Sequence, residues 1–468
     1  MMKAPRQILS LAVQERDVMK KALILILAVI LAGCGTARPV THPGSQTQQS
    51  DEVRARQDID ESTRKAKAHE KESPARDVAK STATGAAVGP AAGAITGDFD
   101  RGLAVGALLP LTGKQATLGN RVLDGLIAGL GLFDRRRAAP VELRIENYGS
   151  DPAAVHRAVA KLADEVRVLA IIGPPEFEAA RVAAKAAQKA QVPLIALSPV
   201  TASEGPRDFV FSDQRSDERE ARTMASYAVK DLGLSRLVVF YPENANGEAM
   251  MNAFRAEVQR LGGKVRRVQS YNPGQTDFSG EIKKLAAIRA PRPSTKKKGA
   301  EPAKTPPPVL DFDALYLPDA FRRVRMILPQ LAFHDVRGVQ LLGTSQWYVP
   351  EGIRKEMDYF EGSVLTAPFF AESSKRSVMN FTDTFFGATG REPDYREALA
   401  YDTARMLLDA LRDKGVTDRR SLRDRLQRIE AFEGVTGWVS MTKTGEMQRG
   451  SFILKVEGRQ IVDVTPEY

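Results

Sequence analysis

Short apolar runs alternate with helical stretches between residues 103 and 343, and this alternation constrains the fold more than any other feature. The runs that indicate strands are 103–109, 141–147, 169–173, 194–197, 236–241, 265–271, 314–317 and 339–343. The helical stretches between them are 121–133, 153–165, 177–190, 218–232, 247–261 and 320–332. Strands that are apolar on both faces and separated by helices form parallel sheets covered by helices. A chain of 468 residues has room for two such sheets.

The order of elements changes near the C-terminus. Predicted helices at 377–386, 395–413 and 421–429 precede predicted strands at 435–440, 450–456 and 460–464. A chain that returns to add helices to one sheet and strands to the other explains this order. We therefore expect an α/β fold of two lobes, each a parallel sheet flanked by helices, with crossovers near 211–216, 365–370 and 433–437. Lobe 1 is predicted at 101–215 and 366–432, and lobe 2 at 216–365 and 433–468.

The N-terminus has the pattern of an export signal. Met19, Lys20 and Lys21 precede an apolar run that ends before Cys34, the single cysteine of the chain. This run is short for a bilayer span, so we predict a signal peptide at 1–33 whose translation starts at Met19. The ending Leu-Ala-Gly-Cys resembles the lipobox of bacterial lipoproteins, which implies a lipid anchor on Cys34. The alternative is a lone cysteine in an ordinary signal peptide.

Two further segments are too polar to join a core. Residues 34–100 are rich in Ser, Thr, Gln and mixed charges, which predicts a flexible tether. Residues 288–308 combine lysines and arginines with a run of three prolines, which predicts an exposed basic insertion. The net charge of +10 lies in this insertion and in scattered arginines, so we expect no nucleic acid partner. A solvated loop is favoured over an anionic partner for the insertion.

Residues 105–113 (VGALLPLTG), followed by Gly119, Asp124 and Gly125, resemble the first strand, loop and helix of leucine-binding-type periplasmic proteins. Segments around Asn147 to Pro152, 171–174, 192–199, 271–278 and 401–404 keep the order of that family. The resemblance covers 101–468 and implies the type 1 periplasmic-binding fold with a ligand between the lobes. The first of these motifs is also similar to penicillin-binding protein activators, which are envelope lipoproteins whose C-terminal domain has the same fold.

Loops that follow parallel strands meet at one edge of a sheet, where helix N-termini and turn amides point into a crevice. The residues of these loops are therefore the candidate ligand-binding positions: Thr112, Gly113, Glu176, Phe177, Ser198, Pro199, Thr201, Tyr241, Glu243, Asp319, Thr344 and Trp347. A Trp or Tyr stacks on a ligand, and an acid meets an ammonium. The alternative for each residue is a helix cap or a turn, and Ser198, Thr201 and Thr344 lie where caps are expected.

Two departures from the family bear on specificity. The resemblance implies that the second loop carries serines that hold a ligand carboxylate, but here that loop contains Pro174, Pro175 and Glu176. A negative charge at Glu176 disfavours a carboxylate there. Leu118 stands where many amino-acid binders have an aromatic residue. Both departures argue against a branched-chain amino acid as the ligand.

Enzyme chemistry is not indicated. The chain has 4 His and 1 Cys, and it contains no nucleophile triad, zinc-ligand spacing or phosphate-binding loop. His156 and His334 stand alone, and an isolated histidine is usually structural or solvated. We expect no cofactor and no metal.

Two functions remain open. One is solute capture, in which the lobes close on a small polar ligand (an amino acid, a peptide or a muropeptide) and pass it to a transporter permease. The other is regulation of a peptidoglycan synthase by an activator-like lipoprotein. Fold does not choose between them, and we place solute binding first because a two-lobed module is built to bind ligands. In either case we expect a lipid-anchored protein in the bacterial envelope facing the periplasm. Gly35 after Cys34 favours the outer membrane over the inner one.

Overall fold

The computed structural model describes residues 103–133, 141–149, 151–200, 207–213, 216–287 and 309–466. The predicted signal peptide, Cys34, the predicted tether, the basic insertion 288–308 and Thr201 lie outside the described residues. Within the described part of the chain, no helix has both the length and the apolar character needed to cross a bilayer.

An eight-stranded sheet organises lobe 1, with the strand order β11-β12-β13-β5-β4-β3-β1-β2. Its strands are β1 (Ala104–Leu109), β2 (Glu142–Asn147), β3 (Ala170–Ile172), β4 (Leu194–Ala196), β5 (Val210–Asp213), β11 (Phe432–Gly434), β12 (Gly437–Met441) and β13 (Glu446–Arg449). Strands β1 to β5 are parallel to their neighbours, and β13 is parallel to β5. The hairpins β11-β12 and β12-β13 are antiparallel. Strands β1, β3 and β4 are buried along their whole length, as their apolar composition predicts.

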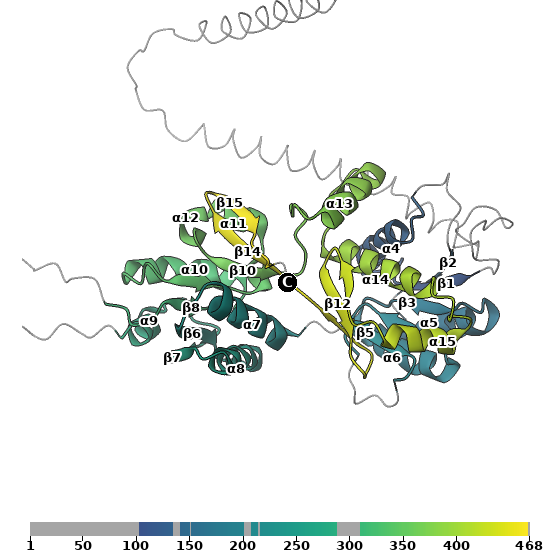
Figure 1. The fold of residues 1–468 in the computed structure, drawn as a ribbon, viewed down its shortest axis with the longest axis horizontal. Helices are drawn as coiled ribbons and strands as arrows, with labels where there is room; N and C mark the ends of the chain where they lie inside the picture. The colour runs from purple at the N-terminus through teal and green to yellow at the C-terminus, as the bar shows by residue number, and fades with distance from the viewer. Residues whose placement is uncertain are drawn as a thin grey trace, which may run out of the picture. The chain divides into compact units, whose positions relative to one another are not determined.

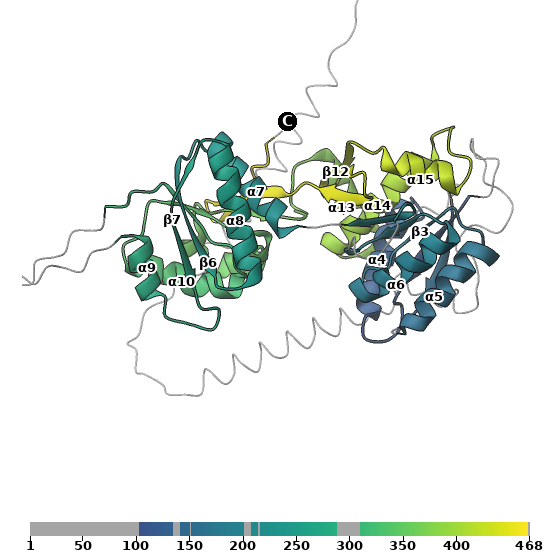
Figure 2. The ribbon, with the colours of Figure 1, turned by 90° about the horizontal axis from the view of Figure 1, so that it is seen from below.

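Helices cover both faces of this sheet (Figures 1 and 2). One face carries α4 (Ala116–Gly129), α14 (Tyr395–Leu411) and α15 (Arg419–Gln427), whose apolar side chains form one core cluster with β1 and β3. The other face carries α5 (Pro152–Ala160) and α6 (Phe177–Ala190), which form a second cluster rich in alanine. The π-helical turn η2 (Lys161–Glu165) extends α5.

A seven-stranded sheet organises lobe 2, with the order β15-β14-β10-β9-β8-β6-β7. Its strands are β6 (Arg236–Pro242), β7 (Lys264–Tyr271), β8 (Ala314–Tyr316), β9 (Gln340–Leu342), β10 (Val364–Ala367), β14 (Phe452–Glu457) and β15 (Gln460–Asp463). Strands β6 to β10 are parallel, whereas β14 pairs antiparallel with β10 and with β15.

Two sets of helices cover the faces of the second sheet. The set on one face is α7 (Asp217–Ser226), its π-helical extension η4 (Tyr227–Asp231) and α8 (Ala245–Arg260). The set on the other is α9 (Ser279–Leu285), α10 (Phe321–Phe333), the 3₁₀ turn η5 (Ser345–Trp347), α11 (Pro350–Lys355) and α12 (Met357–Phe360). Helix α13 (Arg376–Thr389) joins this core through Phe381, whose ring also lies 4.4 Å from that of Tyr401 on α14.

The chain passes between the two sheets three times, as predicted, but the third crossover was placed wrongly. The first follows β5 and the second follows β10, close to the expected positions. The third lies at Gly450 and Ser451, between β13 and β14, and not at 433–437. Residues 433–437 instead belong to the β11-β12 hairpin of the first sheet, because Val439 and Met447 pack into the core of lobe 1. Lobe 1 therefore extends to Arg449.

Candidate functional site

A pocket lies at the edge of the lobe 1 sheet where its parallel strands end, and we call it the lobe 1 pocket. Its empty volume is about 530 Å³. The lining residues are Leu118, Val122, Pro175, Leu197, Ser198, Pro199, Asp213, Tyr395, Arg396 and Leu399. They come from helix α4, the loops after β3 and β4, the end of β5, and the first turn of α14. The pocket therefore lies at the edge of the sheet where the topological rule predicts a ligand.

The wall of the lobe 1 pocket is mainly apolar. Leu118 and Val122 lie one turn apart on α4, Leu197 follows β4, and Leu399 lies on α14. These side chains also belong to the core cluster between the sheet and its helices, so their positions are set by close packing. A ligand with an apolar body would bury that body against a rigid surface.

Ser198 supplies a polar group at this wall. Its side chain is 8% exposed, and its hydroxyl has no hydrogen-bond partner among the residues that the structure describes. A buried hydroxyl without a partner is unfavourable by about 1 to 3 kcal/mol. A ligand oxygen in the pocket would relieve that penalty.

The carboxylate in the pocket, Asp213, is already paired. Arg449 on β13 donates from Nε to Oδ1 of Asp213 at 2.6 Å, and both side chains are 5% exposed. The hydroxyl of Tyr395 lies 3.4 Å from the other carboxylate oxygen, Oδ2. Arg449 also donates to Thr436 and Thr403 at 3.2 Å and lies 3.7 Å from Asp402. The negative charge of Asp213 is therefore compensated inside the protein.

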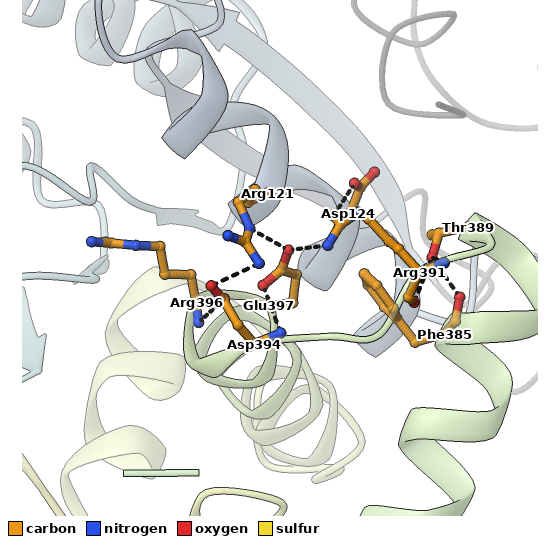
Figure 3. A network of polar contacts seen from close by, with 8 residues as sticks. All are labelled: Arg121, Asp124, Phe385, Thr389, Arg391, Asp394, Arg396 and Glu397. Atoms are coloured by element: carbon orange, nitrogen blue, oxygen red, sulfur yellow. Dashed lines mark hydrogen bonds and ion pairs between the residues drawn. The ribbon is translucent and has the colours of Figure 1, made fainter. Parts of the chain in front are cut away.

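Arg396 brings a positive charge to the pocket. Its side chain is exposed, and no described residue forms an ion pair or hydrogen bond with its guanidinium. Figure 3 shows this guanidinium directed away from Asp124 and Arg391, toward the opposite side of α14. The nearby Arg121 and Arg391 are instead held by acidic residues.

A network of ion pairs around the buried carboxylates of Glu397 and Asp124 fixes the start of α14, and with it Tyr395 and Arg396 (Figure 3). Asp394 caps the helix and forms a reciprocal capping box with Glu397. Arg121 on α4 binds Asp394 and Glu397, each at 2.7 Å. Arg391 binds Glu397 at 2.5 Å and Asp124 at 2.8 Å. Burial, together with the neighbouring Glu397, raises the pKa of Asp394 to about 6.

Close backbone contact holds α14 against α4. A Cβ atom added to Gly125 would lie 2.4 Å from the carbonyl oxygen of Glu397. A Cβ atom added to Gly129 would lie 2.6 Å from the carbonyl oxygen of Tyr401. The two glycines let the helices approach more closely than any side chain permits, which brings the first turn of α14 to the pocket.

A second pocket, of about 430 Å³ empty volume, lies at the crossovers, and we call it the hinge pocket. Its lining residues are Ser216, Arg219, Glu220, Thr223, Pro368, Tyr395, Arg449, Gly450 and Ser451. Residues beside all three crossovers are present in this set. Tyr395 lines both pockets, and the Asp213 and Arg449 pair connects them.

The structure brings some of the predicted residues of lobe 1 together. Ser198 and Pro199 line the lobe 1 pocket. Glu176 is adjacent to it but accepts a 2.8 Å hydrogen bond from the hydroxyl of Tyr148, and burial followed by this contact raises the pKa of Tyr148. Phe177 is 45% exposed on α6, and exposed Thr112 accepts a hydrogen bond from Asn147 at 3.1 Å. Gly113 adopts a φ of 80° in the exposed loop after β1.

The predicted residues of lobe 2 follow β6, β8 and β9, but the two pockets described above do not include them. Tyr241 is half-buried and Glu243 is exposed. Asp319 accepts a 2.6 Å hydrogen bond from Tyr271. Thr344 is a buried cap that accepts from Gln346, which agrees with the alternative of a structural role.

Trp347 requires a correction. Its side chain is 0% exposed, and its indole N–H donates to the carbonyl oxygen of Leu317 at 3.0 Å. The ring packs in the core beside Phe360. Trp347 therefore stabilises lobe 2 and presents no face on which a ligand can stack.

Sequence reasoning missed Asp213, Tyr395 and Arg396. Tyr395 and Arg396 begin a helix after the chain returns to lobe 1, and this position could have indicated them. The sequence pattern alone, however, does not show that this helix belongs to lobe 1. For Asp213, the signal is a carboxylate at the end of a buried strand. Among the described residues, no group of three or more His, Cys, Asp or Glu side chains could hold a metal ion.

Comparisons with known proteins agree with this geometry. A curated relative, the "Leu/Ile/Val-binding protein homolog 3" of Brucella melitensis, is 23% identical over 195 residues. The match covers 40% of this chain and 52% of the relative, so the chain spans about half the length of that protein.

Solved structures share the fold. A crystal structure assigned to a branched-chain amino acid ABC transporter from Rhodospirillum rubrum has a TM-score of 0.65 at 21% identity, covering 78% of this chain and 100% of the other. An ABC transporter substrate-binding protein from Desulfitobacterium hafniense, solved in complex with Leu, has a TM-score of 0.54 at 17% identity, covering 77% and 99%. These likenesses confirm the predicted two-lobed α/β fold of the type 1 binding proteins.

A family model matches most of the chain. The model for "Periplasmic binding protein" matches residues 102–460, which includes both lobes and all three crossovers. Proteins of this kind bind solutes outside the cytoplasm and are not enzymes, in agreement with the binding role predicted from the sequence. With the pocket at the strand ends and this match across both lobes, the chain belongs to the periplasmic binding protein family.

Proposed function

We propose that this protein captures a small solute of amino-acid size and delivers it to an ABC transporter permease. The observation that carries the proposal is the lobe 1 pocket, whose mainly apolar wall includes the buried hydroxyl of Ser198, for which the described residues offer no hydrogen-bond partner. The Rhodospirillum and Desulfitobacterium proteins are described as ABC transporter components, which supports a transporter as the partner. The match to binding proteins across both lobes favours solute capture over regulation of a peptidoglycan synthase.

The hinge pocket supports a mechanism of lobe closure. Three crossovers are the only covalent links between the sheets in the described chain, and residues beside each of them line this pocket. Glu220 on α7 accepts a 3.0 Å hydrogen bond from the Ser345 hydroxyl and further hydrogen bonds from Thr366 and the Ser345 amide. A ligand held by lobe 1 would be covered by lobe 2 through rotation about these crossovers.

A thermal-shift screen of the protein carrying Cys34→Ser tests solute capture. A ligand that binds the native state raises the free energy of unfolding by about 2.7 kcal/mol at a hundredfold excess over its Kd. We expect a shift with one chemical class among amino acids, simple carboxylates, short peptides and muropeptides. Cooperative unfolding without a shift from any class would overturn the proposal.

We also propose that Cys34 carries a lipid anchor that holds the protein at the periplasmic side of the outer membrane. The lipobox-like ending before Cys34 and the Gly at position 35 support this proposal. Cys34→Ser should release the protein to the soluble fraction, and membrane separation should place the unaltered protein with outer-membrane markers. Retention of the Cys34→Ser protein in the membrane would contradict the anchor.

A further inference from the structure

The charges that face the lobe 1 pocket do not cancel. Arg396 contributes a guanidinium that no described residue neutralises. Asp213 is the only carboxylate among the described lining residues, and Arg449 compensates it at 2.6 Å. Ser198 and Tyr395 are neutral polar groups. Arg396 is therefore the one charged side chain among the lining residues that has no described partner, whereas the carboxylate of Glu176 beside the pocket accepts a hydrogen bond from Tyr148 at 2.8 Å.

Of the three arginines near the start of α14, only Arg396 is not paired with a described acid. Arg121 and Arg391 reach toward the same helix start, but Asp394, Glu397 and Asp124 hold both of them. Figure 3 shows Arg396 leaving this network on the other side of α14. Its backbone N–H is fixed by Asp394 at 2.8 Å, so the side chain starts from a rigid position.

Neither carboxylate that lines the two pockets is without a partner, and Glu176 beside the lobe 1 pocket accepts a hydrogen bond from the Tyr148 hydroxyl at 2.8 Å. Both carboxylate oxygens of Asp213 have partners, Arg449 and Tyr395. Glu220, the acid of the hinge pocket, is committed to Ser345 and Thr366. An amino acid would therefore bring a positive charge next to Arg396 without an acid that is free to receive it.

We propose that Arg396 is a specificity-determining residue that selects apolar monocarboxylates over zwitterionic amino acids. The carboxylate of the ligand meets the guanidinium of Arg396, the hydroxyl of Ser198 donates to a ligand oxygen, and the apolar body packs against Leu118, Val122 and Leu399. Arg is suited to this task because its planar guanidinium binds a carboxylate through two parallel hydrogen bonds. This inference rests on the proposed solute-binding function and names the class of solute.

Matched ligands separate the contributions of charge and shape. Leucine, 4-methylpentanoate and 4-methylpentanamide share one apolar body, but they carry a zwitterion, a carboxylate and a neutral amide, respectively. Phenylalanine, 3-phenylpropanoate and 3-phenylpropanamide form a second set with an aromatic body. Calorimetry on the protein carrying Cys34→Ser measures Kd for each of them. We expect the carboxylate of one set to bind at least about tenfold more tightly than its amino acid and its amide.

Variants of two arginines on the same helix complete the experiment. Arg396→Gln should weaken carboxylate binding at least about tenfold, and Arg396→Lys should restore part of the affinity because it keeps the charge. Arg405→Gln removes another exposed arginine of α14 that lines neither pocket, and it should leave the affinity unchanged. All three variants should unfold at the temperature of the parent, because both side chains are exposed.

The outcomes distinguish the two proposals. Tight binding of an amino acid, or carboxylate binding that Arg396→Gln does not weaken, overturns the assignment of Arg396 and leaves solute capture intact. An equal loss of carboxylate affinity in Arg396→Gln and Arg405→Gln also overturns it, since the loss then comes from removing any positive charge of the helix. Absence of binding by every ligand of both sets and of the wider screen overturns solute capture and this inference together.

Discussion

Arg449 and Asp213 form a buried ion pair in which Nε of the guanidinium lies 2.6 Å from Oδ1 of the carboxylate, and this pair joins the ends of two crossovers. Asp213 is the last residue of β5, before the first crossover, and Arg449 is the last residue of β13, before the third. The pair keeps β13 beside β5, which is why the third crossover falls after the strand that contains Arg449. The same pair borders the lobe 1 pocket and the hinge pocket.

Replacing Arg449 should strongly destabilise lobe 1. Arg449→Met leaves the carboxylates of Asp213 and Asp402 buried without their cation, which should lower the free energy of unfolding by about 3 to 5 kcal/mol. Urea titration measures the change. Arg260→Met removes an arginine that pairs with Glu257 on the surface and should have a small effect. Similar losses in the two variants would show that the buried pair has no special role.

The contact of α4 with α14 should not tolerate a side chain at Gly125. Gly125→Ala places a Cβ 2.4 Å from a backbone oxygen, so we expect a loss of about 1 to 3 kcal/mol in unfolding free energy. Ligand affinity should fall as well, because the helix that presents Arg396 must move. Gly387→Ala is the control, since a Cβ at this position, in the last turn of α13, meets no atom within 4 Å. Gly387→Ala should stabilise the protein by up to about 1 kcal/mol. If Gly125→Ala also stabilised the protein, the argument from close helix packing would be contradicted.

Trp347 should contribute to stability and not to ligand affinity. Trp347→Phe removes the indole N–H that donates to the Leu317 carbonyl, with an expected loss of about 1 to 3 kcal/mol in unfolding free energy. Kd for the ligand found in the screen should be unchanged. Trp438→Phe serves as the control because that ring is 56% exposed. A tenfold weaker ligand affinity in Trp347→Phe alone would restore Trp347 to the binding site.

The pH dependence of stability should carry the signature of Asp394. Burial, followed by the neighbouring Glu397, raises its pKa from 3.8 to about 6, so the folded state binds the proton more tightly than the unfolded chain does. Its contribution to stability is therefore present below about pH 4 and is lost as the pH rises through 6. Asp394→Asn keeps an oxygen that can cap the helix, but its side chain does not titrate, so it does not lose stability as the pH rises. The unfolding free energy of Asp394→Asn relative to the parent should rise between pH 4 and 7.

Asp418 provides a matched control for that titration. It also caps a helix, α15, but hydrogen bonds from Ser421 lower its pKa from 3.8. Its contribution is lost only as the pH falls below 4, so Asp418→Asn should show a flat difference from pH 4 to 7. A flat or falling difference for Asp394→Asn over the same range would contradict the raised pKa.

Local patterns predicted most of the fold. The predicted strands and helices of residues 103–343 agree in position with β1 to β4, β6 to β9 and the helices between them, because the periodicity of buried side chains is a local property. The short strands β5 and β10 were interpreted only as crossovers. They are strands of four residues whose pairing depends on their neighbours in the sheets.

The C-terminal strands show where local patterns stop being sufficient. The segments 435–440 and 450–456 are similar apolar runs, yet β12 joins the first sheet and β14 the second. The composition of the two segments does not indicate which sheet each of them joins. It depends on Met447 and Val439 entering the core of lobe 1 and on Arg449 meeting Asp213, which is 236 positions away in the chain.

The sequence by itself determined the two-lobed α/β architecture, because alternating periodicity dictates it, and its motifs carried the resemblance to the binding-protein family. Strand direction predicted the edge of the sheet at which the lobe 1 pocket lies. Only the tertiary structure decided which side chains reach that edge. Arg121, Arg391 and Arg396 have the same chemistry in the sequence, but the first two are neutralised by acids that come from α4, the loop before α14 and α14 itself, up to 276 positions away. A charge becomes available to a ligand only when the folded chain leaves it without a partner, and that condition is set by long-range contacts.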